Sequence, residues 1–126
     1  MLATPVVRRR FDEKGAFYDS HGEYPRVVRE VAKEEGVPLL EMENATRALV
    51  QDLGEEDSRA LYLHFEPGEH PLLPDGLHDD THFSELGARL VAELAAREMV
   101  RVRLAVAEHL LRLGACWPWE NGAPDR

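Results

Sequence analysis

Three stretches of the chain repeat apolar residues at the three- and four-residue spacing of an amphipathic helix. They span residues 24–35, 42–53 and 84–98. Pro25 lies in the first turn of the first stretch and Gly36 follows its end, which are favoured positions at helix boundaries. Ser84 opens the third stretch as a helix N-cap, with Glu85 in its first turn. The pattern therefore predicts three helices.

Two short apolar runs, residues 2–7 and 37–40, precede helical stretches and are typical of buried strands. The order strand–helix–strand–helix predicts an α/β fold with a parallel sheet. Residues 57–65 fit either a short helix or a strand, and residues 66–80, rich in proline and glycine, are predicted to form a loop. Because two strands are too few for a sheet covered on both faces, we expect an incomplete three-layer α/β/α structure that lacks strands.

Composition narrows the class of protein only slightly. The 126 residues suffice for one small domain, and the net charge of −9 disfavours nucleic acid as a partner because phosphate contacts need a basic surface. The single cysteine, Cys116, excludes an internal disulfide and fits a reducing compartment. The first ten residues lack a signal peptide's apolar run, and no stretch is apolar over the ~18 residues of a membrane span. We expect a cytoplasmic protein that binds no membrane.

The densest group of chemically active side chains lies at residues 77–84, Leu-His-Asp-Asp-Thr-His-Phe-Ser. Asp79 and His82 suit a catalytic pair in which the carboxylate orients an imidazole base. Alternatively, His78, Asp79, Asp80 and His82 carry the ligand types of a divalent-metal site, although one tight turn rarely points four side chains at one centre. The residues can also simply cap the helix that follows, so the pattern alone leaves three interpretations open.

Several stretches, taken in order, resemble the SGNH/GDSL hydrolases and, more narrowly, the rhamnogalacturonan acetylesterase branch. Residues 79–84, followed by Gly87 and Ala88, resemble the last motif block of that family. The resemblance covers about residues 2–98 and includes the stretches 4–9, 17–25, 61–65 and 67–71. It implies a doubly wound α/β/α fold and hydrolysis of acetyl esters on carbohydrate, without metal or organic cofactor. In this interpretation His82 is the general base and Asp79 its orienting partner.

The same family uses a serine in a Gly-Asp-Ser block and oxyanion-hole glycine and asparagine residues, the latter in a Gly-x-Asn-Asp block. This sequence contains neither block, so we expect the N-terminal half of the family pattern to be missing. Its serines are Ser20, Ser58 and Ser84, none of which lies at a strand-to-helix turn, and Ser84 is explained as a helix cap. Because losing one oxyanion donor alone costs about 10²–10³ in turnover, we expect the chain by itself to be inactive or nearly so.

The remaining features favour structural or partner-binding roles. We expect His21, His64 and His70 to be structural or to face substrate. We expect the tail, residues 99–126, to be helical beyond the domain at 1–98, either continuing the preceding helix or forming another. Trp117 and Trp119 are expected to pack within that tail. The alternative to an esterase part is a non-catalytic module that forms a homo-oligomer or binds a complementing N-terminal half.

Overall fold

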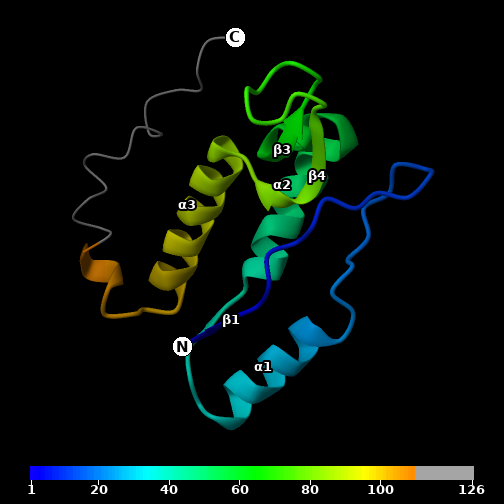
Figure 1. The fold of residues 1–126 in the computed structure, drawn as a ribbon. Helices are drawn as coiled ribbons and strands as arrows, with labels where there is room; N and C mark the ends of the chain where they lie inside the picture. The colour runs from blue at the N-terminus through cyan, green and yellow to red at the C-terminus, as the bar shows by residue number, and fades with distance from the viewer. Residues whose placement is uncertain (110–126) are drawn as a thin grey trace.

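The computed structural model of the protein describes residues 1–109. Its elements are β1 (Leu2–Ala3), α1 (Tyr24–Glu34), β2 (Leu39–Leu40), α2 (Met42–Asp57), the 3₁₀ helix η1 (Ser58–Leu61), β3 (Tyr62–Phe65), β4 (Leu77–Phe83) and α3 (Glu85–Arg101) (Figure 1). The three predicted helices are confirmed, and residues 57–65 contain both a 3₁₀ turn and a strand. The predictions for Cys116, Trp117 and Trp119 concern residues outside the described range.

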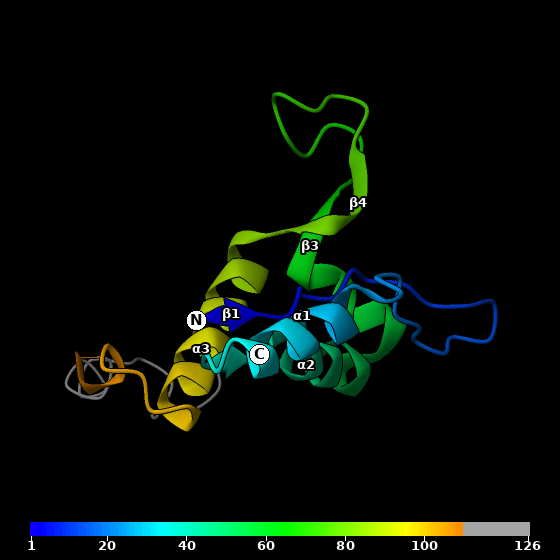
Figure 2. The same cartoon turned by 90° about the horizontal axis from the view of Figure 1, so that it is seen from below.

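A two-stranded parallel sheet joins the two apolar runs, as predicted. Leu2 pairs with Leu39 and Ala3 with Leu40. The strands are shorter than the runs, and beyond β1 the backbone N–H of Val7 donates to the Thr46 hydroxyl of α2 (3.1 Å). Figures 1 and 2 show α1 on one side of this sheet and α2 with α3 on the other. The chain is thus a mixed α/β protein with small sheets.

A second, antiparallel sheet pairs β3 with β4, and the predicted loop at 66–80 is wrong for its last four residues, which belong to β4. The register is irregular beside Tyr62. Tyr62 faces Phe83 and its neighbour Leu63 faces Asp79, so one step along β3 matches four along β4. Three residues, 80–82, are therefore extra on β4. This irregularity hid the strand from sequence patterning, which depends on regular alternation.

The apolar core lies beneath the start of α3. Its buried members are Val7, Val50, Leu61 and Tyr62, and the Tyr62 hydroxyl donates to the carbonyl of Val7 (2.9 Å). Gly87 allows α3 to approach this core, because a Cβ at that position would lie 1.9 Å from the Leu61 carbonyl oxygen. The junction between β4 and α3 is therefore held directly against η1.

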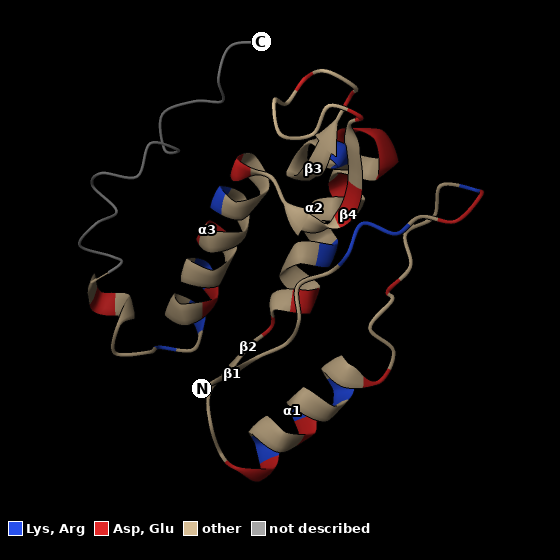
Figure 3. Ribbon diagram, in the orientation of Figure 1, with Lys and Arg blue, Asp and Glu red and all other residues tan. Residues whose placement is uncertain are grey.

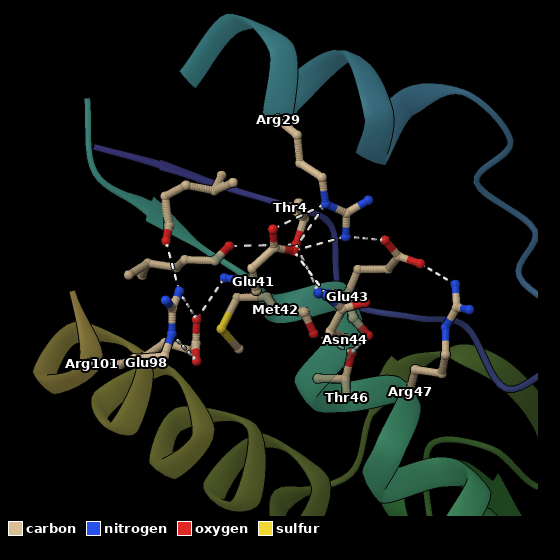
Figure 4. Close-up of polar contacts among 12 residues, drawn as sticks. Thr4, Arg29, Glu41, Met42, Glu43, Asn44, Thr46, Arg47, Glu98 and Arg101 are labelled. Carbon is tan, nitrogen blue, oxygen red and sulfur yellow. Dashed lines mark hydrogen bonds and ion pairs between the residues drawn. The ribbon is translucent and has the colours of Figure 1, made fainter. Parts of the chain in front are cut away.

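A seam of buried and half-buried polar groups ties the helices to the parallel sheet (Figure 4). The nearly buried Glu43 carboxylate accepts from Arg29 of α1 (2.7 Å) and from Arg47. Arg29 also donates to Glu41 (2.8 Å), whose backbone N–H donates to Glu98 of α3 (2.8 Å). Because these contacts link α1, α2 and α3, the seam fixes the layers relative to one another.

Charged side chains of both signs are interleaved along the helices (Figure 3). On α3, for example, Arg89 pairs with Glu85 one turn earlier (2.6 Å). Exposed pairs of this kind contribute about 0.3–0.5 kcal/mol each. Within residues 1–109, no helix combines the length and the apolar character that crossing a membrane requires.

Candidate functional site

The structure brings Asp79 and His82 together at the irregular turn in β4. Nδ1 of His82 lies 2.6 Å from Oδ2 of Asp79. The other carboxylate oxygen, Oδ1, accepts the backbone N–H groups of Thr81 (2.7 Å) and His82 (3.0 Å). Asp79 thus organises the three extra residues of β4 and holds the imidazole with the same carboxylate. A spacing of three residues therefore suffices to form the predicted contact.

Hydrogen bonds keep the Asp79 carboxylate ionised. The backbone N–H of His82, then the His82 side chain and the backbone N–H of Thr81, lower the pKa of Asp79 from 3.8 to about 2. A carboxylate in this position favours a proton on Nδ1 of His82 and so leaves the Nε2 lone pair available. The His82 side chain is 73% exposed, and no group among residues 1–109 hydrogen-bonds to its Nε2. This geometry suits a general base that takes a proton on Nε2.

A second carboxylate–histidine pair, which sequence reasoning missed, starts at the next residue. Oδ1 of Asp80 contacts Nε2 of His64 (3.0 Å) and Nη1 of Arg9 (2.9 Å). Nδ1 of His64 in turn lies 3.4 Å from Nδ1 of His78. The His64 side chain is only 10% exposed and both of its ring nitrogens have neighbours. His64 therefore fits the structural role expected of it.

The other two histidines with sequence expectations also have local partners. Nδ1 of His21 contacts Oδ1 of Asp19 (2.9 Å), and both side chains are mostly buried. Nδ1 of His70 accepts the backbone N–H of Leu72 (3.2 Å), and the ring packs against Phe65. Both histidines thus organise the loops that contain them.

The four-residue metal site is not assembled. The Asp79 carboxylate contacts His82, whereas the Asp80 carboxylate contacts Arg9 and His64. In the described part of the chain, no group of three or more histidine, cysteine, aspartate or glutamate side chains is placed to hold a metal ion. The structure therefore offers no support for a site made of His78, Asp79, Asp80 and His82.

Ser84 joins β4 to α3, so the expectation that no serine lies at a strand-to-helix turn is wrong. Its side chain nevertheless caps α3, as predicted, and Asp79 and His82 do not cap it. The Ser84 hydroxyl accepts from the backbone N–H of Gly87 (3.1 Å) and donates to the Ala60 carbonyl (2.7 Å). Ser58 is fully buried and donates to the Glu55 carbonyl (3.2 Å), while Ser20 is exposed in a loop. No serine within residues 1–109 hydrogen-bonds to His82, so none is placed as its nucleophile.

An open hollow of about 370 Å³ lies beside β3 and the start of α3. Its lining consists of Arg59, Ala60, Tyr62, His64, Phe65, Glu66, Glu69 and Ser84. His82 is absent from this lining, and its side chain is 73% exposed.

Sequence comparison finds two related proteins of Bacillus subtilis (strain 168). The chain is 42% identical over 111 residues to the rhamnogalacturonan acetylesterase RhgT, a match that covers 88% of this chain and 48% of the relative. It is 29% identical over 112 residues to YesY, named "Probable rhamnogalacturonan acetylesterase", covering 89% of this chain and 47% of that protein. The chain thus spans about half the length of these relatives. No family profile matches the sequence, and no solved structure matches the fold.

Proposed function

Because the chain is homologous to rhamnogalacturonan acetylesterases over about half of their length, and so to part of an SGNH hydrolase, we propose that it supplies the general base of a carbohydrate acetylesterase. The observation that carries the proposal is the exposed His82 imidazole, oriented by the ionised Asp79 carboxylate at 2.6 Å. The proposed substrate class is an acetyl ester of rhamnogalacturonan, in keeping with the name of the 42% identical relative.

The proposed chemistry needs a serine from polypeptide outside these 126 residues. Nε2 of His82 takes the proton of that serine hydroxyl, and the serine oxygen attacks the acetyl carbonyl carbon. The imidazolium, stabilised by Asp79, then gives its proton to the leaving sugar oxygen. Water, deprotonated by His82, releases acetate from the acyl-serine. The sequence contains no Gly-Asp-Ser block, so these residues alone are proposed to be inactive.

The proposal extends to the fold. Helices on both sides of a parallel two-stranded sheet are the start of a three-layer α/β/α arrangement. We assign residues 1–98 to an incomplete SGNH domain and residues 99–126 to a tail, whose first three residues, 99–101, continue α3. The two-residue strands support this assignment, because strands so short need neighbours to form a stable sheet.

An esterase assay of the chain alone tests the proposal. With p-nitrophenyl acetate and with acetylated rhamnogalacturonan, we expect release of acetate at the same rate from the wild type and from His82→Ala. Turnover that His82→Ala abolishes would show that the chain contains its own nucleophile, which the proposal denies.

A partner-binding role is the second candidate, and one surface favours it. Tyr24, Val27 and Val31 of α1 are exposed large apolar residues at helical spacing, and they form an uncovered stripe along the helix. We propose that the part of the domain absent from these 126 residues covers this stripe. An apolar stripe of this kind also permits self-association.

Gel filtration with light scattering distinguishes these occupants. If the stripe mediates self-association, the wild type is a dimer or larger and Val27→Glu is a monomer. If the stripe instead binds the remainder of the domain, the wild type and Val27→Glu are both monomers, and Val27→Glu impairs binding to that remainder. Arg26→Glu, on the polar side of α1, is the matched control.

A further inference from the structure

A cross-strand pair of histidines on the β3–β4 hairpin has an unusual arrangement of its nitrogens. His64 of β3 faces His78 of β4 in the strand register. Their Nδ1 atoms are 3.4 Å apart, and the rings meet edge to face. Neither residue belongs to the Asp79–His82 pair, so the proposed esterase chemistry does not use them.

Neighbouring groups determine where the imidazole protons lie. The Asp80 carboxylate is paired with Arg9 and can only accept, so Nε2 of His64 carries a hydrogen. The guanidinium of Arg59 can only donate, and its Nη2 lies 3.2 Å from Nδ1 of His78, which must therefore accept. In neutral His64, Nδ1 has a lone pair as well. The two Nδ1 lone pairs thus lie 3.4 Å apart with no imidazole hydrogen between them, and among residues 1–109 the only donor near them is Arg59, so a cation that replaces the Arg59 contact can take both.

The distance between the two nitrogens suits a transition metal. Two imidazole nitrogens bound to zinc at about 2.05 Å with a tetrahedral angle are about 3.3 Å apart, close to the observed 3.4 Å. The contact between Nε2 of His64 and Asp80 is the outer-shell hydrogen bond that histidine ligands of metals usually make. Two inner-shell nitrogens of such a site, and one outer-shell contact, are therefore already in place.

We propose that His64 and His78 bind one divalent transition-metal ion of the kind that prefers imidazole, namely Zn²⁺, Ni²⁺ or Cu²⁺. The ion displaces Arg59 from Nδ1 of His78, and Arg59 keeps its contact with Glu66 (2.9 Å). The remaining coordination positions are filled by water, for which the adjoining hollow beside His64 has room. Because the ion joins β3 to β4, it stabilises the hairpin that also carries Asp79.

Isothermal titration of the whole chain with zinc chloride tests this site. We expect one Zn²⁺ per chain, and a loss of at least about tenfold in affinity in His64→Gln and in His78→Gln, with about tenfold for Asp80→Asn. Arg59→Ala removes the competing guanidinium, so Zn²⁺ binding tightens. His70→Gln and His82→Gln, histidines on the same segment, are the matched controls and keep wild-type affinity.

His78→Gln decides the matter if His64→Gln fails to fold, because the His78 side chain is exposed whereas His64 is mostly buried. Paramagnetic Ni²⁺ gives a second readout, in which the imidazole signals of His64 and His78 broaden before those of His21 and His70. Absence of bound Zn²⁺, or an affinity unchanged in His78→Gln, would overturn the proposal. The contact between the two Nδ1 atoms would then be a hydrogen bond from a protonated imidazole.

Discussion

Two adjacent aspartates of β4 hold histidines in contrasting ways. Asp79 binds His82, three residues along the chain, and the histidine side chain is 73% exposed. Asp80 binds His64 of another strand and Arg9 near the N-terminus, and the histidine side chain is 10% exposed. The contact distances are similar, at 2.6 and 3.0 Å. A carboxylate–histidine contact therefore does not by itself indicate a base, because a base also needs an unoccupied, accessible nitrogen.

The loss of unfolding free energy on removing each pair should differ, because one pair is mostly buried and the other exposed. Asp80 joins three distant segments, because Arg9 also donates to the carbonyl of Glu55 at the end of α2 (3.2 Å). Among the described residues, the Asp79 side chain hydrogen-bonds only to residues 81 and 82. We therefore expect the Asp80–His64 pair to stabilise the fold, whereas the Asp79–His82 pair is positioned by the local turn at residues 79–82. The following substitutions separate these two roles.

Gly87→Ala has the largest expected effect on the free energy of unfolding, and it disturbs both aspartate–histidine pairs. A Cβ would lie 1.9 Å from the Leu61 carbonyl oxygen, so α3 must move away from η1 and shift the end of β4 with it. Overpacking of this severity costs about 3 kcal/mol or more. Urea denaturation measures the loss, and Ala92→Gly, at an exposed position of the same helix, is the control with an expected cost of about 1 kcal/mol. Equal effects of the two changes would contradict the close approach.

Asp80→Ala comes next. It leaves Nη1 of Arg9 and Nε2 of His64, both on mostly buried side chains, without their acceptor. Leaving such groups unpaired costs about 2 kcal/mol of unfolding free energy. The same denaturation experiment measures it, and Arg9→Met combined with Asp80→Ala should recover part of the loss. A cost below that of Asp79→Ala would reverse the assignment of roles.

Asp79→Ala has a smaller effect on stability. The backbone N–H groups of Thr81 and His82 lose their acceptor but can bind water instead, so we expect a smaller loss of unfolding free energy than in Asp80→Ala. His82→Ala, which removes an exposed side chain, should change stability by about 0.5 kcal/mol or less. A loss in His82→Ala as large as that in Asp80→Ala would show that His82 supports the fold.

The pH dependence of Asp79 gives the smallest signal. Its pKa is lowered to about 2, so its contribution to stability is complete above about pH 4 and is lost as the pH falls towards 2. Carboxyl ¹³C chemical shifts followed against pH report the titration directly. In His82→Ala the pKa of Asp79 should rise but stay below 3.8, because the backbone N–H groups remain. Titration of the wild type at an ordinary pKa would contradict the hydrogen bonding described.

What the sequence predicts here depends on how local each contact is. Helices were predictable because their apolar spacing and their boundary residues Pro25 and Ser84 lie within the helix itself. Asp79 and His82 were predictable because one turn joins them. The contact of Asp80 with Arg9 spans 71 positions and that with His64 spans 16, so no local pattern reveals them. The last four residues of the predicted loop, which belong to β4, were missed for a related reason: their partner strand and irregular register are tertiary features.

The most direct measurement of the role of His82 uses a chimera in which these residues replace the matched region of the 42% identical relative RhgT, which then contributes the rest of the protein. Acetate release from acetylated rhamnogalacturonan is measured for the chimera and for its His82→Ala variant, with circular dichroism to verify folding. If His82 is the general base, the chimera is active and the variant loses about 10³-fold in kcat. A folded, active chimera whose kcat is unchanged by His82→Ala would contradict it.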